Sequence, residues 1–163
     1  MSEIIIRKAE RADCNEIYKL ICAIAEYEHM SELVSGSVSD IEHLLFVSGV
    51  GRCLLACDRD KDGERVIGFA LYFYNLSTFK CRAGIYLEDL FVYPEYRGRG
   101  IGKRLLKTLC GIAKDEGLGR MDWECLDWNQ PSLDFYHSLG ARDMDEWIHL
   151  RVDEADFDKL LGS

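Results

Sequence analysis

The segment Arg97-Gly98-Arg99-Gly100-Ile101-Gly102 places three glycines within five residues, and Lys103 follows it directly. Glycines let backbone N–H groups approach phosphate oxygens because no Cβ atom intervenes, and a helix that starts at the loop adds its positive end. The arginine and lysine side chains supply cationic donors in the same place. These residues predict a loop that binds a pyrophosphate.

Two common phosphate-binding patterns do not fit this loop. A dinucleotide fingerprint needs G-x-G-x-x-G, but neither possible register has the third glycine. A Walker A loop fails because Gly98 is one residue too close to Gly102 and because no Ser or Thr follows Lys103. The pattern that remains is R/Q-x-x-G-x-G/A, which Arg97, Gly100 and Gly102 match.

The elements that must position this loop are predicted by the spacing of apolar residues. We expect one α/β domain over residues 1–163 with a mixed sheet, because hairpins alternate with helical crossovers. Apolar runs predict strands over residues 4–7, 53–57, 66–74, 85–92, 121–126 and 147–152. Helical spacing predicts helices over residues 13–27, 39–46, 101–113, 129–139 and 153–161. The glycine loop then lies between a strand and a long helix.

Short signatures mark the expected helix ends. Asp13 with Glu16, and Ser39 with Glu42, fit capping boxes at two helix starts. Gly140 fits the position after the last residue of a helix, where a left-handed backbone is common.

Composition predicts a soluble, cytoplasmic protein. The 29 acidic residues exceed the 20 Lys and Arg residues and give a net charge of −9, whereas nucleic-acid binding draws most of its affinity from a positive surface. The sequence has no apolar run of membrane-spanning length and no signal-peptide pattern. We therefore expect neither a nucleic-acid nor a membrane partner.

The seven cysteines are expected to be reduced and mostly buried thiols. Their number is odd, and most lie in apolar segments. The sequence has no C-x-x-C pair, and its four histidines are scattered. No metal site is therefore expected.

The loop pattern and the order of the elements resemble the GCN5-related N-acetyltransferases. Further segments resemble the diamine acetyltransferases, a family with spermidine/spermine N1-acetyltransferases and a thialysine-preferring branch. These segments are Glu-Tyr-Glu-His-Met at 26–30, Tyr-Leu-Glu-Asp-Leu-Phe-Val at 86–92, Pro-Glu-Tyr-Arg-Gly at 94–98 and Asp-Trp-Asn-Gln at 127–130. The resemblance implies a mostly antiparallel sheet with a bulged central strand, acetyl-CoA as acetyl donor and a primary amine as acceptor. It also implies a homodimer whose C-terminal strand lies near the interface.

The resemblance assigns the contacts with acetyl-CoA to three segments. The central strand would meet the acetyl and pantetheine portion where it splays from the strand over 121–126, the glycine loop would bind the pyrophosphate, and the start of the helix over 129–139 would contact pantetheine and nucleotide. Asn129 and Ser132 are also ordinary helix-start residues. The implied set is Leu90, Phe91, Val92, Arg97, Gly98, Arg99, Gly100, Ile101, Gly102, Lys103, Asn129, Gln130, Pro131 and Ser132.

Tyr136 is the residue that the resemblance assigns to catalysis. In the family, the tyrosine of the Phe-Tyr pair after Asn-x-Pro-Ser lies beside the thioester sulfur, and Phe135-Tyr136 matches that pair. Attack by an amine releases a thiolate, which a phenol can protonate. A tyrosine in an amphipathic helix is otherwise commonly a core residue with its hydroxyl in water.

Acidic residues carry the expectation about the acceptor, because ammonium groups separated by methylenes need carboxylates along an apolar groove. The resemblance places Glu28, Glu88, Asp122, Trp123 and Glu124 at this site, and Tyr27 is added to them for its aromatic ring. Tyr27 would offer a cation–π wall, and Glu88 would accept the amine proton through a water. Since Glu88 and Asp89 alternate along a strand, one should face the groove while the other serves structure.

The chain departs from the family near the acceptor groove. Phe79 stands where the family commonly has a Trp, and the loops before Cys53 and over 143–146 are shorter. Two alternatives therefore stay open: an acetyltransferase of the same fold acting on a protein lysine, an N-terminus or an aminoglycoside-like amine, and an acyl-CoA-binding sensor without chemistry. The joint presence of Tyr136, Glu28 and Glu88 disfavours the sensor.

Overall fold

The computed structural model describes residues 3–162. These residues form two compact units, one ending at Glu124 and the other starting at Cys125. Every helix in the described range falls short of the length and apolarity that a membrane span requires.

The first unit contains a five-stranded sheet with the order β1-β2-β3-β4-β5. The strands β1 to β4 pair antiparallel, and β5 pairs parallel to β4. A parallel neighbour requires a crossover, which the helix between β4 and β5 provides. The mixed, mostly antiparallel sheet that was predicted is therefore confirmed. The strands are β1 Glu3–Lys8, β2 Arg52–Asp60, β3 Gly63–Ser77, β4 Arg82–Val92 and β5 Met121–Trp123.

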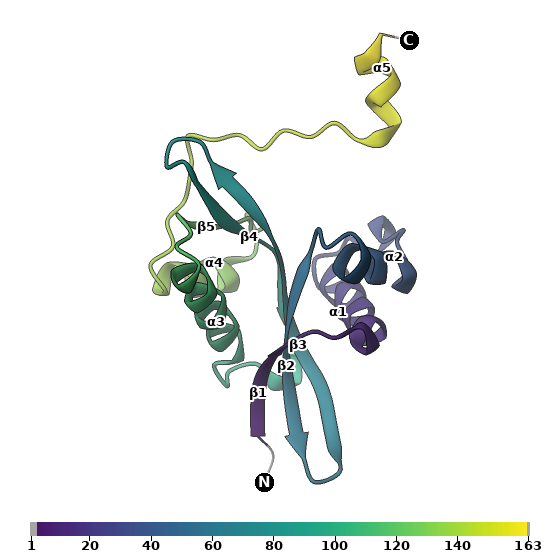
Figure 1. Cartoon of the computed structure of the whole chain (residues 1–163), viewed down its shortest axis with the longest axis vertical. Helices are drawn as coiled ribbons and strands as arrows, with labels where there is room; N and C mark the ends of the chain where they lie inside the picture. Colours follow the sequence, from purple (N-terminus) through teal and green to yellow (C-terminus); the bar gives the residue numbers. More distant parts are fainter. Residues whose placement is uncertain (1–2, 163) are drawn as a thin grey trace. The chain divides into compact units, whose positions relative to one another are not determined.

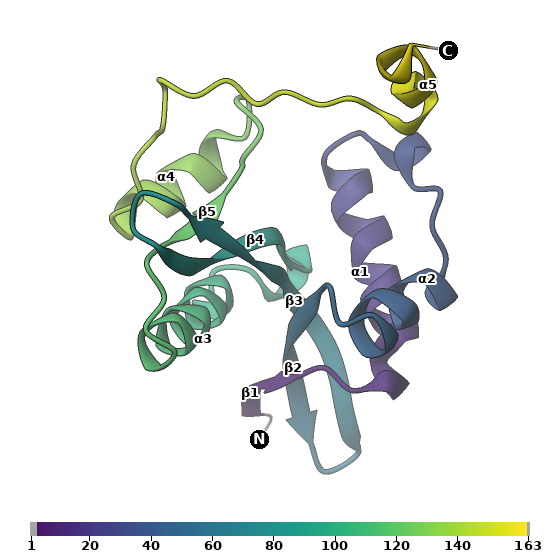
Figure 2. The ribbon, with the colours of Figure 1, turned by 45° about the horizontal axis from the view of Figure 1, so that its top comes forward.

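Helices cover both faces of this sheet. Helices α1 (Cys14–Tyr27) and α2 (Val38–Glu42) lie on one face, and α3 (Ile101–Asp115) lies on the other (Figures 1 and 2). On the α1 face, Ile17 and Leu20 of the helix pack with Phe69 and Phe91 of the sheet. The predicted apolar face of α3 is buried at Leu105, Leu106 and Leu109, while Ile112 is half-buried.

A register shift interrupts the pairing of β3 with β4. Leu71 pairs with Asp89, but the next residue, Tyr72, pairs with Leu87, so Glu88 is an extra residue in β4. This is a β-bulge, which bends a strand and reorients the residues that follow it. Strand β5 pairs with β4 only as far as Leu87, opposite Trp123. The bulged central strand implied by the family resemblance is confirmed.

The start of α1 differs from the expected capping box. The carboxylate of Asp13 accepts hydrogen bonds from Arg7 on β1 and from the backbone N–H of Glu10. The capping box therefore joins Glu10 and Asp13 around a 3-10 turn ahead of α1, not Asp13 and Glu16. The prediction was wrong because the competing partner, Arg7, lies on another element.

The start of α2 is also displaced. Ser37 accepts from the backbone N–H of Asp40, and Asp40 in turn accepts from the N–H of Ser37, so the box is formed by these residues and not by Ser39 and Glu42. Helix α2 continues directly into a π-helical turn, His43–Val47. The helical segment predicted over 39–46 is present, with its start earlier.

The second unit contains α4 (Gln130–Ser138), a 3-10 turn (Glu154–Asp156) and α5 (Phe157–Leu161). The helix predicted over 129–139 is confirmed, and Gly140 follows it with a left-handed φ of 91°. The expected strand over 147–152 is wrong, because these residues are irregular in structure. A strand requires a hydrogen-bonding neighbour, and within 125–162 no other segment forms one.

Gly68 on β3 is a position where the close approach of two strands excludes a side chain. A Cβ atom there would lie 2.7 Å from the carbonyl oxygen of Phe91 and 3.2 Å from Cα of Val92. Because these backbone atoms cannot move without straining the sheet, we expect Gly68→Ala to lower the free energy of unfolding by about 1–3 kcal/mol. Urea denaturation measures this change. Gly111→Ala on α3 is the control, because nothing lies within 4 Å of the added Cβ atom and a gain of up to about 1 kcal/mol is expected. Equal stabilities of the two variants would contradict the close approach.

Candidate active site

The bulge determines which backbone groups of β4 face its open edge. Before the bulge, the N–H of Ile85 donates to Arg120 on the β5 side at 3.1 Å, and after it the N–H of Tyr93 donates to Ile67 on the β3 side at 3.0 Å. Backbone groups alternate in direction along a strand. Leu90 and Val92 therefore direct their N–H and C=O groups away from β3, beyond the point where β5 pairing ends. This open edge can donate hydrogen bonds to a bound carbonyl or amide.

The glycine loop connects β4 to α3. Gly98 and Gly100 have left-handed φ values of 75° and 72°, which side-chain-bearing residues rarely adopt. A Cβ atom at either position would meet nothing within 4 Å, so the surface over the loop is open. Gly100 is the N-cap of α3, whose unpaired N–H groups make the positive helix end available to an anion. The geometry suits a pyrophosphate, as the sequence predicts.

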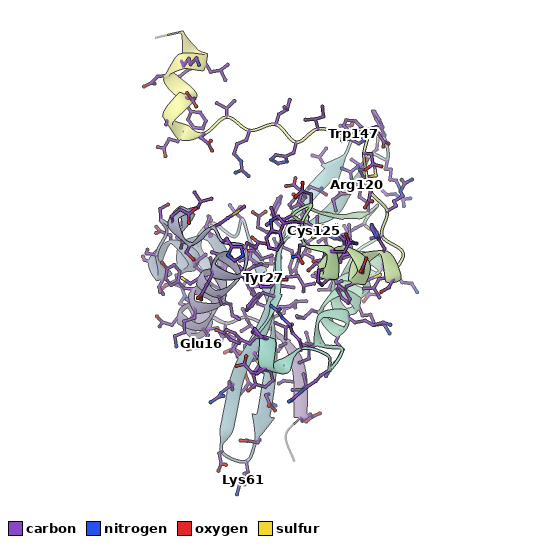
Figure 3. The ribbon with its side chains drawn as sticks, turned by 180° about the vertical axis from the view of Figure 1, so that it is seen from behind. Glu16, Tyr27, Lys61, Arg120, Cys125 and Trp147 are labelled. Carbon is purple, nitrogen blue, oxygen red and sulfur yellow. The ribbon has the colours of Figure 1, made fainter. Side chains whose placement is uncertain are left out.

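The side chain of Arg97 contacts two other elements. Its Nε donates to the carbonyl oxygen of Val92 at 2.9 Å. Its guanidinium carbon lies 4.7 Å from the ring centre of Tyr27 and 5.3 Å from that of Phe91. Tyr27, labelled in Figure 3, is the last residue of α1, and its ring centre lies 6.5 Å from that of Phe91. A contact between Arg97 and pyrophosphate remains a prediction.

Three carboxylates line one cavity on the α1 face of the sheet. The cavity has a volume of about 360 Å³ and is bounded by α1, the loop after it, α2 and the middle of β4. Glu28, Asp40 and Asp89 contribute the acids, and the carboxylate of Asp40 already accepts hydrogen bonds from Ser37 at the start of α2. Isoleucines are among the apolar residues of the cavity wall. An apolar cavity with acidic groups is complementary to an alkyl ammonium ion.

Burial changes the pKa values of Glu28 and Asp89. Burial, followed by the nearby charges of Glu88 and Glu28, raises the pKa of Asp89 to about 7. Burial also raises the pKa of Glu28 above its ordinary value. A bound cation would favour the ionised form of both groups, so the cavity is set up to bind positive charge.

The sequence-based site did not include Asp89. Alternation along β4 predicted that one of Glu88 and Asp89 faces the groove, and Asp89 is the one that lines the cavity, while Glu88 is exposed at the bulge. A regular strand would have placed Glu88 opposite Leu71 on this face. Alternation predicted that only one of the two acids faces the cavity, and the position of the bulge determines that it is Asp89.

The acceptor residues predicted on β5 and directly after it have partners of their own. Asp122 forms an ion pair with Arg120 at 2.6 Å and accepts from Nδ2 of Asn75 at 3.0 Å. Burial and a hydrogen bond with Glu124 raise the pKa of Tyr86 above its ordinary value. Of the described residues, Glu28 and Asp89 line the cavity whereas Asp122, Trp123 and Glu124 do not. Their contact with an acceptor remains a prediction.

The predicted residues that follow Glu124 lie in the second unit. The side chain of Asn129 is buried and caps α4 by accepting from the N–H of Ser132 at 3.4 Å, as its helix-start pattern predicts. Gln130 donates to Asp134 one turn later at 2.7 Å. Tyr136 lies in α4, with its ring 5.3 Å from that of Phe135. Contacts of these residues with acetyl-CoA, and the catalytic role of Tyr136, stay predictions.

The raised pKa of Asp89 predicts a pH-dependent stability. Its folded pKa of about 7 exceeds the ordinary 3.8, so the folded state retains a proton that the unfolded chain releases. Raising the pH from 5 to 8 should therefore lower the free energy of unfolding of the wild type. The Asp89→Asn variant should not show this loss. Urea unfolding at both pH values measures the difference. Asp62→Asn, in an exposed turn, is the control, and identical pH dependence of Asp89→Asn and wild type would refute the assignment.

Comparison with known proteins agrees with this geometry. Residues 14–141 match the Acetyltransferase (GNAT) family. A thialysine N-epsilon-acetyltransferase of Bos taurus is 39% identical and covers 99% of both chains. A human spermidine/spermine N(1)-acetyltransferase-like protein is 35% identical over 89% of this chain and 22% of its own length. The solved structure of an integron cassette protein from V. cholerae superposes with a TM-score of 0.80, at 26% identity and 98% coverage of both chains. An open β4 edge, a glycine loop at a helix start and a match over most of the chain place this protein in the GNAT acetyltransferase family.

Proposed function

We propose that the protein transfers acetyl from acetyl-CoA to a primary amine of a small lysine-like or polyamine substrate. The observation that carries the acceptor class is the apolar cavity whose acids are Glu28, Asp89 and Asp40. Asp89 immediately precedes Leu90, the first outward-facing residue of the open β4 edge, so the amine cavity and the edge are adjacent along one strand. The thialysine N-epsilon-acetyltransferase of Bos taurus supports the same class of acceptor.

The donor half of the site follows from the first unit. Acetyl-CoA supplies the thioester carbon that the amine attacks. The glycine loop and the start of α3 hold the pyrophosphate, and the outward N–H of Leu90 polarises the thioester carbonyl as an oxyanion site does. Acetyl-CoA use by the GNAT family supports this assignment.

The chemistry is direct transfer in a complex of enzyme and both substrates. A C–N bond forms between the amine and the acetyl carbon as the C–S bond breaks. The amine proton passes to Glu88 through a water, and Tyr136 protonates the leaving thiolate. The exposure of Glu88 at the bulge supports its access to water.

A panel of acceptors with acetyl-CoA tests the proposal. We expect thialysine or spermidine to release free CoA faster than a histone peptide or an aminoglycoside. Preference for the peptide would instead support the protein-lysine alternative, and binding of acetyl-CoA without CoA release on any acceptor would support the sensor.

Assembly as a homodimer and a cytoplasmic location belong to the same proposal. The irregular segment 147–152 supports the dimer, because its residues Trp147, Ile148 and Leu150 are 67%, 83% and 85% exposed. Trp147 is labelled in Figure 3. A partner that paired with this segment would bury these apolar side chains and satisfy its backbone.

Removal of the Tyr136 hydroxyl tests the general acid. We expect Tyr136→Phe to depress kcat by roughly 10²-fold or more while the dissociation constant of acetyl-CoA stays nearly the same, because the ring is kept and only the proton donor is lost. Steady-state kinetics and calorimetric titration measure the two quantities. Unchanged turnover would remove the role.

Neutralisation of Glu28 tests the acidic cavity. Glu28→Gln should raise KM for spermidine more than KM for a short monoamine, because only the longer substrate presents a second ammonium group to the cavity. Glu26→Gln, an exposed position on the same helix, is the control. An equal rise in KM for both acceptors would contradict an extended cation site.

A further inference from the structure

Arg97 joins three parts of the site through one side chain. It directly precedes the left-handed Gly98 at the start of the glycine loop. Its Nε holds the carbonyl oxygen of Val92 at 2.9 Å, on the outward edge of β4. Its guanidinium lies over the ring of Tyr27, 4.7 Å from the ring centre.

Tyr27 transmits this contact to the amine cavity. It is the last residue of α1, and the next residue is Glu28, one of the three cavity carboxylates. His29 follows, and its left-handed φ of 60° is unusual for a residue with a side chain. A shift of Arg97 would move the stacked ring and, with it, the helix end that positions Glu28.

We propose that Arg97 is a positioning residue that couples occupation of the glycine loop to affinity of the cavity for an amine. The coupling depends on the planar guanidinium, which can donate through Nε and stack on a ring at the same time, and a lysine ammonium cannot do both. Because binding energies are linked, acyl-CoA in the loop then raises amine affinity, and amine raises acyl-CoA affinity by the same factor. This inference rests on the proposed function.

Calorimetric titration of thialysine, with and without saturating desulfo-CoA, measures the coupling without turnover. Desulfo-CoA lacks the sulfur that carries the acetyl group, so no acetyl can move. In the wild type we expect desulfo-CoA to tighten thialysine binding by about 5-fold or more. In Arg97→Lys, which keeps the positive charge, we expect the tightening to fall to within about twofold of none.

Matched variants separate coupling from general damage. Arg52→Lys is the control, because Arg52 lies 4.6 Å from the ring centre of Tyr74, away from the site, and its replacement should leave the wild-type coupling. Tyr27→Phe keeps the ring face and should keep the coupling, whereas Tyr27→Leu should lose it. If Arg97→Lys fails to fold, the comparison of Tyr27→Phe with Tyr27→Leu still tests the coupling.

Two results would overturn the inference alone: wild-type coupling in Arg97→Lys or Tyr27→Leu, or thialysine binding to the wild type that desulfo-CoA does not change. Failure of the wild type to bind or acetylate any amine of the panel would instead overturn the proposed function, and this inference with it.

Discussion

The extra residue at Glu88 determines the arrangement of the first unit's site. Before the bulge, β4 pairs on both sides, and after it the strand pairs only with β3. The shift turns the backbone of Leu90 and Val92 outward and places Asp89 opposite Leu71 on the α1 face. In a regular strand, other residues of β4 would direct their backbone groups outward, and Glu88 would stand in place of Asp89 opposite Leu71. One inserted residue thus produces an open backbone edge and a cavity-lining acid at neighbouring positions of β4.

The cavity beside this edge places carboxylates next to apolar side chains, which is unfavourable for the ionised form of the acids. Glu28 and Asp89 lie among isoleucines, and burial raises the pKa of each group. An isolated carboxylate loses hydration in such surroundings, and a bound ammonium restores part of that loss. The site therefore favours a cationic ligand with an alkyl chain. The loss of hydration of these carboxylates is thus part of the reason that the cavity favours a cation.

The glycine loop and the end of α1 are connected by the side chain of Arg97. Arg97 starts the loop, bonds to Val92 and stacks on Tyr27, so the loop, the open edge and the end of α1 share one contact. The sequence pattern assigns Arg97 to phosphate binding because motif residues are read as ligands. The structure adds contacts between elements that are distant in sequence, and these give the same residue a structural connection to the acceptor side.

The sequence by itself determined features that depend on local spacing. Apolar periodicity located α1, α3, α4 and the first four strands, and the glycines identified the loop because left-handed φ values demand them. Family resemblance supplied the bulge and the acid Glu28. Tertiary structure alone decided what depends on distant partners: Asp13 bonds to Arg7 instead of capping α1, and the apolar segment 147–152 forms no strand. It also selected Asp89 over Glu88 for the cavity, because the direction of a side chain in a sheet follows from register with the neighbouring strand, which no single segment encodes.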